Sequence, residues 1–242
     1  MNDKRLEHVK HFYKLLDVLE GKVGGKRILA ECHGRMDWPK RGVYFFFEQG
    51  EPRTTSGEGS RVVRVGTHAL KSGSKATLWN RLRQHRGKLG GRNPGSGNHR
   101  GSVFREHVGT ALIEKDNWSG EIAGNWGGSN APRQIKDAEV PLEREISKYI
   151  GSMPFIWLEI DDEPSPDSIR GVIERNTISL LSNFCEQSDP IDPASDNWLG
   201  KFAKSDDIKQ SGLWNVNHVR ECYEPDFLIL LDELVAQVSQ GK

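Results

Sequence analysis

The chain has 242 residues, and its 34 Lys and Arg side chains are balanced by 34 Asp and Glu side chains, so the formal net charge is zero. A hydrophobic fraction of 35% argues against a wholly disordered chain, and no apolar run approaches the roughly 18 residues of a membrane span. The charged residues 1–10 do not resemble a signal peptide, and three widely spaced cysteines exclude a disulfide framework or a paired-cysteine zinc site. We therefore expect a cytoplasmic globular protein with no membrane partner.

The first third of the chain predicts a helix followed by two strands. Residues 3–20 carry apolar side chains at spacings of three and four, which predicts an amphipathic helix. The Gly-rich, basic residues 22–40 read as a connector. The aromatic run 43–47 and the Val-rich run 62–65 then predict two buried strands. Because a polar loop joins them, we expect an antiparallel hairpin.

The remaining two thirds predict one more strand and several helices. The apolar run 155–160 reads as the third strand. The helices are expected at 77–86, 102–113, about 142–150, about 166–186 and about 224–239. This order predicts an α+β fold, with a small antiparallel three-stranded sheet flanked by helices.

Charge is distributed very unevenly along this neutral chain. Residues 60–110 hold 11 basic side chains and a single acidic one, whereas residues 111–242 hold 12 basic and 24 acidic side chains. A block this basic suggests a binding site for a polyanion, and the alternative is a solvated face that pairs with the acidic tail. The helix start at Ser102, inside this block, is a candidate phosphate site.

Four motifs follow one another in a characteristic order. They are Gly42-Val43-Tyr44 on the first strand, Arg64-Val65-Gly66 on the second, Leu78 to His85 with Arg81 on the next helix, and Ile173-Glu174-Arg175-Asn176 on the helix after the third strand. In this order they resemble the GIY-YIG nuclease family, in its restriction and homing endonuclease branch. The resemblance covers about 41–86 and 154–184.

The resemblance implies a domain organisation. Residues 1–40 would form an N-terminal helix and connector, and residues 41–186 a catalytic domain with a helical insertion at about 87–153. Residues 187–242 would be a C-terminal extension that packs on the core.

The resemblance also implies a role for each motif residue. Tyr44 would take a proton from water, and His85 would orient that water or accept a proton. Arg81 would bind the nonbridging phosphate oxygens, where charge grows in the transition state. Glu174 would hold Mg²⁺, with Mn²⁺ as a substitute, because a hard carboxylate oxygen suits such an ion.

One motif residue departs from the family pattern, because Arg64 stands where the second signature has a tyrosine. Arg64 could favour the ionised form of Tyr44 on the neighbouring strand, since a nearby positive charge stabilises a phenolate. We therefore expect a metal-dependent endonuclease that hydrolyses phosphodiester bonds in DNA, in a restriction or defence setting. The alternative is a catalytically impaired nucleic-acid-binding module, and a dimer is left open.

Several residues have competing interpretations at this point. Tyr44 could simply pack in the core, Arg83 competes with Arg81, and Glu143 and Glu145 compete with Glu174. The expected nucleic-acid contacts are the basic side chains of the middle block, namely Lys71, Lys75, Arg83, Arg86, Lys88, Arg92, Arg100 and Arg105.

Overall fold

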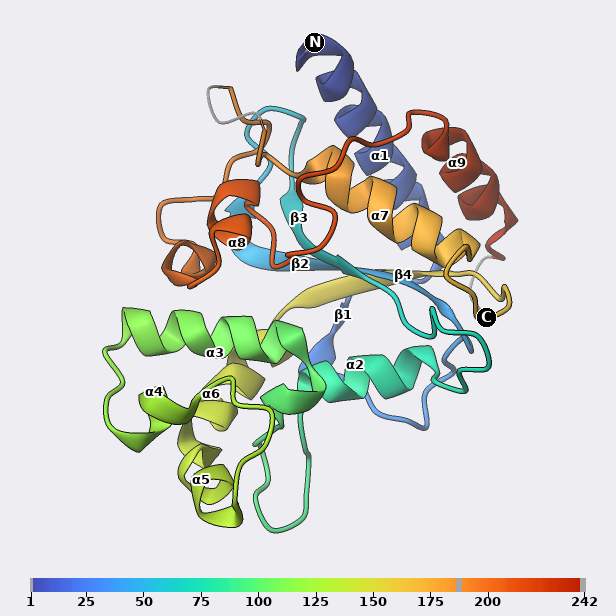
Figure 1. The fold of residues 1–242 in the computed structure, drawn as a ribbon. Coiled ribbons are helices and arrows are strands. Elements are labelled where there is room, and N and C mark those ends of the chain that lie inside the picture. Colours follow the sequence, from blue (N-terminus) through green and yellow to red (C-terminus); the bar gives the residue numbers. More distant parts are fainter. Residues whose placement is uncertain (1, 186–188, 240–242) are drawn as a thin grey trace.

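A four-stranded antiparallel sheet forms the centre of the computed structural model, which describes residues 2–185 and 189–239 (Figure 1). The strands are β1 (Arg27–Ile28), β2 (Gly42–Pro52), β3 (Ser60–Gly66) and β4 (Pro154–Glu159). Their order across the sheet is β1-β4-β2-β3, so β3 forms one edge and β2 lies inside. β2 and β3 make the predicted hairpin, and β4 returns from far along the chain to pair with the other side of β2.

Helices cover both faces of this sheet. They are α1 (Asn2–Lys22), α2 (Leu78–Arg86), α3 (Val103–Lys115), α4 (Glu121–Asn125), α5 (Arg133–Ala138), α6 (Val140–Gly151), α7 (Ile169–Leu181), α8 (Asp206–Ser211) and α9 (Phe227–Gln237). In Figure 1, α1, α7 and α9 lie on one side of the sheet, and α2, α3 and α6 lie on the other. None of the helices in the described ranges is both long and apolar enough to cross a membrane.

The expected α+β class is confirmed, but the expected number of strands was wrong by one. The additional strand, β1, pairs Arg27 with Phe155 and Ile28 with Pro154. Two residues are too few to show the alternation of apolar and polar side chains that marks a strand in a sequence. β1 therefore lay unrecognised within the predicted connector.

The long predicted helices are present, with different bounds. α7 begins after Ser168, whose side chain accepts a hydrogen bond from the backbone of Gly171, and ends at Leu181. It is thus shorter than the predicted 166–186, and residue 186 lies outside the described residues. The helices α4, α5 and α8 were missed because five or six residues cannot show a helical period.

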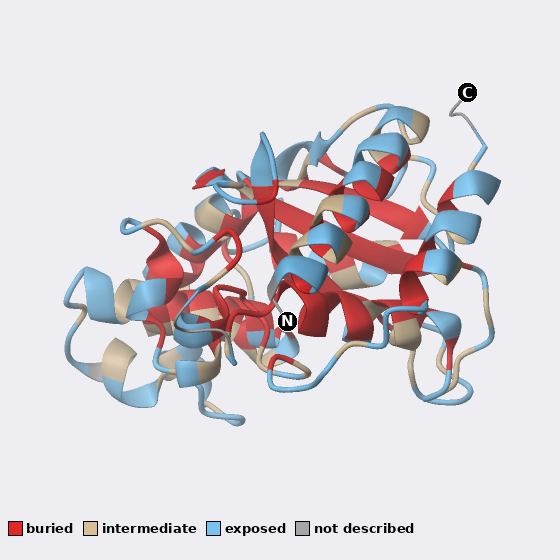
Figure 2. Ribbon diagram, turned by 90° about the horizontal axis from the view of Figure 1, so that it is seen from above, coloured by how far each residue is buried: buried red, intermediate tan, exposed pale blue. Residues whose placement is uncertain are grey.

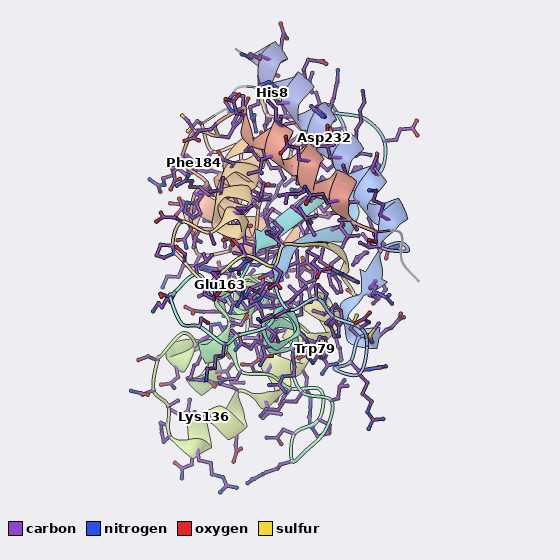
Figure 3. The ribbon with its side chains drawn as sticks, turned by 90° about the vertical axis from the view of Figure 1, so that its right-hand side faces the viewer. His8, Trp79, Lys136, Glu163, Phe184 and Asp232 are labelled. Atoms are coloured by element: carbon purple, nitrogen blue, oxygen red, sulfur yellow. The ribbon has the colours of Figure 1, made fainter. Side chains whose placement is uncertain are left out.

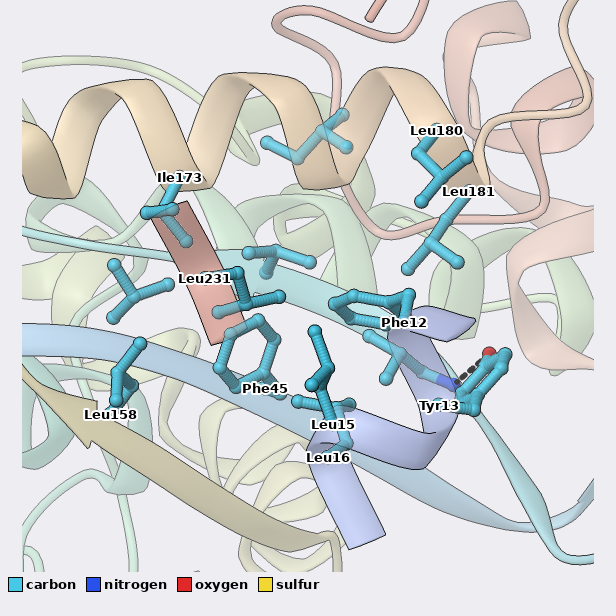
Figure 4. Close-up of a cluster of buried hydrophobic side chains, with 14 of the residues drawn as sticks. Phe12, Tyr13, Leu15, Leu16, Phe45, Leu158, Ile173, Leu180, Leu181 and Leu231 are labelled. Atoms are coloured by element: carbon cyan, nitrogen blue, oxygen red, sulfur yellow. Dashed lines mark hydrogen bonds between the residues drawn. The ribbon is translucent and has the colours of Figure 1, made fainter. Parts of the chain in front are cut away.

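Alternation along β2 divides the interior into two layers. Val43 and Phe45 point into an apolar cluster with residues of α1, α7 and α9 (Figure 4). Tyr44 and Phe46 point the other way, into a cluster with residues of α2, α3 and α6. The strands are buried on both faces, while the helices keep an exposed outer side (Figure 2). This pattern is the one expected for a sheet between two helical layers.

A β-bulge in β3 changes which way one side chain points. Phe46 pairs with Arg64, but Phe47 pairs with Val62, so Val63 is an extra residue on this strand. As a result, Val63 belongs to the cluster on the α2 side, and Arg64 contacts Phe104 on that same side. Bulges re-aim side chains in this way and are frequent beside functional sites.

The segment that follows α8 covers the outer edge of β3. The backbone N–H of Trp214 donates to the carbonyl of Val63 (2.7 Å). The Asn215 amide then pairs with both backbone groups of Val65, accepting from its N–H (3.1 Å) and donating to its carbonyl (2.9 Å). This segment therefore satisfies edge groups that an uncovered strand would expose.

The first and last helices pack against each other. The ammonium group of Lys22, at the end of α1, donates to the carbonyls of Val235 and Ala236 at the end of α9, where cations are favoured. α5 lies at the opposite end of the molecule, where Figure 3 shows Lys136 distant from His8 and Asp232. The division of the chain into residues 1–40, a catalytic domain at 41–186 with an insertion at about 87–153, and an extension at 187–242 stays a prediction.

Candidate active site

The two motif glycines allow the close approach of strands and side chains around Tyr44. A Cβ atom added to Gly66 would lie 2.3 Å from the Tyr44 hydroxyl oxygen, because the tyrosine ring crosses over this residue. A Cβ atom on Gly42 would lie 2.4 Å from the carbonyl oxygen of Leu158 on β4. Larger residues at either position would displace Tyr44 or separate β2 from β4. The glycines therefore set the position of the tyrosine.

Arg64 lies in the interior on the same face as Tyr44. Its guanidinium stacks on the Phe104 ring (4.6 Å to the centroid), donates to the Trp214 carbonyl and interacts with the Tyr44 hydroxyl. Burial lowers the pKa of Arg64, while the neighbouring Tyr44 and Glu174 oppose that shift. A cation is thus placed beside the hydroxyl of Tyr44, as the sequence analysis anticipated.

His85 connects α2 to Tyr44 and to α3. Its Nε2 atom lies 2.8 Å from the Tyr44 hydroxyl, and its Nδ1 atom lies 2.8 Å from the Ser102 hydroxyl. Burial lowers the pKa of His85 well below its usual value, and the charges of Arg81 and Arg64 lower it further. The imidazole is therefore neutral at physiological pH.

Arg81 lies one turn before His85 at the border of the site. Its side chain is partly exposed and donates to the Gln84 side chain (3.1 Å) and to the Gly101 carbonyl (3.4 Å). Its charge acts on His85 and also on Glu174. Arg81 is therefore the cation of the site that solvent reaches.

Glu174 reaches the site from the opposite helical layer. It is partly exposed on α7, and its Oε1 atom accepts the backbone N–H of Thr67 (3.0 Å), the residue that follows β3. Burial raises the pKa of the Glu174 carboxyl, and the charge of Arg64 together with the Thr67 N–H opposes this. Because β3 is an edge strand, a side chain from α7 can pass its end and approach the cations.

The five predicted site residues thus gather beside the end of β3, with different access to solvent. Tyr44 and His85 have no exposed surface, and Arg64 is buried. Arg81 and Glu174 are partly exposed. A ligand from solvent would meet Arg81 and Glu174 first.

Comparison with known families places the whole chain in one of them. The model of the GIY-YIG domain matches residues 3–241. The chain belongs to the GIY-YIG family. Membership indicates nuclease activity and confirms the resemblance inferred from the motifs. Comparisons with curated proteins and with solved structures give no match.

The side chains expected to contact nucleic acid fall into two groups, those exposed to solvent and those held by other residues of the protein. Lys71, Lys75, Arg83 and Lys88 are exposed and, within the described chain, form no salt bridge. Arg92 is also exposed and forms a surface ion pair with Asp137. These five side chains lie on α2 or in its flanking loops, where solvent reaches all of them.

The other three arginines expected to contact nucleic acid form contacts inside the protein instead. Arg105 has no exposed surface, and its guanidinium binds the Glu143 carboxylate and the His85 carbonyl (2.8 Å). Arg86 is buried and donates to the Cys32 carbonyl. Arg100 forms a two-bond pair with Glu139 (2.6 and 2.7 Å). These side chains hold the interior together, a role that a basic composition does not distinguish from DNA binding.

Ser102 is also not the surface phosphate site that its helix start suggested. It is buried, caps α3 by accepting the Arg105 backbone N–H, and contacts His85. The carboxylate of Glu143, an alternative to Glu174, is instead bound by Arg105 and His99. The burial of both residues follows from long-range packing that their local sequence does not reveal.

Sequence analysis missed two residues that lie close to the GIY-YIG site. Trp214 supplies the carbonyl that holds Arg64. His218 lies close enough to Glu174 to lower the pKa of that carboxyl, and its own Nδ1 is held by Glu221 (2.8 Å). Both residues come from the C-terminal segment, which has no motif. The one local sign is a cluster of Trp, Asn and His at 214–218.

Proposed function

We propose that this protein is a metal-dependent endonuclease that hydrolyses phosphodiester bonds in DNA. The observation that supports it is the convergence of Tyr44, Arg64, Arg81, His85 and Glu174 at the end of β3, from both helical layers. Family membership supports the reaction class. The setting that we propose, restriction or defence in the cytoplasm, rests on the resemblance to that branch of the family.

The side chains divide the chemistry between them. Tyr44 accepts the proton of the attacking water, and Arg64 places a buried positive charge on the same side of the sheet. Arg81 binds the nonbridging oxygens of the phosphate, because it is the arginine of the site that solvent reaches. His85 holds the Tyr44 oxygen in place through its Nε2 atom.

Glu174 is the residue that would hold the metal ion. In the described part of the chain, no group of three or more His, Cys, Asp or Glu side chains could enclose a metal. A single carboxylate nevertheless fits Mg²⁺ or Mn²⁺, since Mg²⁺ is bound by one or two carboxylates together with substrate phosphate and water. When bound there, the ion would stabilise charge on the phosphate and on the leaving oxygen.

The exposed cations beside α2 would guide the DNA backbone to this site. Lys71 and Lys75 lie in the loop before α2, and Arg83 and Lys88 lie on α2 and just after it. Arg92 lies in the loop that follows α2. Such contacts position a duplex without reading its sequence, and they make binding salt-dependent.

A nucleic-acid-binding module without cleavage is the second candidate. Two observations favour it: Arg64 replaces the second motif tyrosine, and the Tyr44 hydroxyl has no access to solvent. In an active enzyme, the site must open so that water can reach Tyr44. The two candidates differ in activity and not in the surface that binds DNA.

Cleavage of supercoiled plasmid tests the first candidate against the second. We expect wild type to cut with Mg²⁺ or Mn²⁺ and to stop when EDTA is added, and Glu174→Gln to bind DNA without cutting it. Glu233→Gln, an exposed residue of α9, is the matched control and should cut normally. If wild type binds but never cuts, while Arg64→Tyr does cut, the second candidate is correct.

A further inference from the structure

A continuous line of hydrogen-bonding groups runs from Ser102 through His85 to Tyr44. Both contacts of the imidazole ring are 2.8 Å long, and all three side chains are buried. Ser102 belongs to the insertion that carries α3, outside every motif of the family signature. The Ser102 hydroxyl is therefore the group of the insertion that bonds to the His85 ring.

Protons in this line can point in one of two directions. In the first, the Tyr44 hydroxyl donates to Nε2, and Nδ1–H donates to Ser102. In the second, the Ser102 hydroxyl donates to Nδ1, and Nε2–H donates to the Tyr44 oxygen. Each direction corresponds to one neutral tautomer of His85, and the partner of one ring nitrogen sets the state of the other.

The charges around the ring favour the second direction. In the first, Tyr44 could lose its proton only to His85, and an imidazolium would form next to Arg64, Arg81 and Arg105. Burial and these three cations oppose that charge. In the second, Nε2–H donates to the Tyr44 oxygen and His85 stays neutral, so no further positive charge forms beside Arg64, Arg81 and Arg105.

The surroundings of Ser102 are compatible with this direction. Its oxygen accepts the backbone N–H of Arg105 (3.3 Å), which leaves its hydrogen available for Nδ1. Arg105 in turn donates to the His85 carbonyl (2.8 Å), so α3 holds the histidine at its ring and at its backbone. We propose that Ser102 is a positioning residue that fixes His85 as the Nε2–H tautomer, so that the ring donates a hydrogen bond to the Tyr44 oxygen. The catalytic consequence rests on the proposed nuclease function, but the tautomer does not.

The tautomer can be measured without any activity. Long-range ¹⁵N–¹H NMR of the histidine-labelled full chain distinguishes a protonated ring nitrogen from an unprotonated one, and His85→Gln assigns the signals. We expect wild type and Ser102→Thr, which keeps the hydroxyl, to show protonated Nε2 and unprotonated Nδ1. Ser102→Ala should lose this fixed state. Protonated Nδ1 in wild type, or an unchanged His85 spectrum in Ser102→Ala, would overturn the proposal.

Cleavage rates give an independent readout in an active enzyme. Ser102→Ala should lower kcat by about 10-fold to 100-fold, as is typical when the partner of a functional histidine is removed, and shift the pH–rate profile to higher pH with little change in KM. Ser102→Thr should restore both. Ser96→Ala, a buried serine of the same insertion that bonds only to the Asn93 carbonyl through its side chain, is the control for loss of a hydroxyl. A Ser102→Ala profile that superimposes on wild type contradicts the positioning role, whereas inactivity of wild type itself bears only on the proposed function.

Discussion

The two faces of the sheet contact different kinds of side chain. On the α1 side, the strands meet an almost wholly apolar layer, in which Phe45 packs on Phe12 of α1 and near Leu231 of α9 (Figure 4). On the α2 side, the same strand places Tyr44 against His85, and the neighbouring strand adds the buried cation of Arg64. One strand therefore contributes to an apolar core with its odd-numbered residues and to a polar site with its even-numbered ones.

The difference shows how a small domain can carry buried charges. Polar groups without partners cost free energy when buried, so the α2 side depends on extensive hydrogen bonding. Arg105 illustrates this, because all of its donors are directed to Glu143, Ser147 or the His85 carbonyl. The apolar α1 side supplies stability, and we expect substitutions on the two faces to separate stability from activity.

The largest expected effect is the loss of activity in Tyr44→Phe. Removing a group that takes a proton in the transition state lowers rates by about 10²–10⁴-fold. Tyr13→Phe is the matched change on the α1 side, where the hydroxyl accepts the Val62 N–H (3.1 Å). It should cost about 1–3 kcal/mol of unfolding free energy, because a buried donor loses its partner, and should leave the rate intact. Plasmid cleavage and urea unfolding of both variants measure this, and a fast Tyr44→Phe enzyme contradicts the base assignment.

The next effect is on stability. Leu231→Ala removes a fully buried side chain of the α1-side cluster and should cost about 2–5 kcal/mol of unfolding free energy. Its neighbour Ile229 is 62% exposed, so Ile229→Ala should change stability by less than about 0.5 kcal/mol. Chemical denaturation gives both values, and the specific activity of the folded fraction should stay at the wild-type level. Equal losses in the two variants would mean that α9 does not pack as described.

Two arginines on α2 distinguish catalysis from binding. Arg81→Ala should lower the cleavage rate by about 10²–10³-fold, by analogy with the loss of one oxyanion donor. Arg83→Ala, an exposed position two residues away, should weaken DNA binding and reduce the slope of log affinity against log salt by about one unit. Single-turnover rates and salt-dependent gel shifts separate the two, and a catalytically dead Arg83→Ala would show that the roles are exchanged.

The smallest effect concerns stability in mild acid. Burial and the Arg64 charge lower the pKa of His107 on α3 to about 4, against about 6.5 in an unfolded chain. Below pH 6.5 His107 becomes protonated in the unfolded chain but stays neutral in the folded one. The free energy of unfolding therefore falls as the pH falls towards 4. His107→Gln should reduce this fall by on the order of 1 kcal/mol, and the exposed His33→Gln should not. Thermal unfolding from pH 7.5 to pH 5 measures it; parallel curves for His107→Gln and wild type would exclude His107 as a contributor.

The sequence predicts the local parts of this molecule and not the long-range ones. The order of motifs indicates the family, and helical periods locate the long helices. No local pattern marks the bulge at Val63, and the covering of β3 by Asn215 depends on a partner far along the chain. The structure was also needed to show which basic side chains of residues 60–110 reach solvent. Arg105 and Lys88 are both basic residues of this block, yet Arg105 is fully buried and Lys88 is exposed.

The pairing of α1 with α9 has a consequence for biosynthesis. α1 is synthesised about 200 residues before its partner at 227–237, which at ~5–20 residues per second is a delay of roughly 10–40 s. During that time the apolar stripe of α1 and the outer edge of β3 are exposed, and the carbonyl of Trp214 that holds Arg64 does not yet exist. Contacts this distant also slow folding. Until α9 emerges the contact between α1 and α9 cannot form, so we expect the layer on the α1 side of the sheet to be completed late in synthesis.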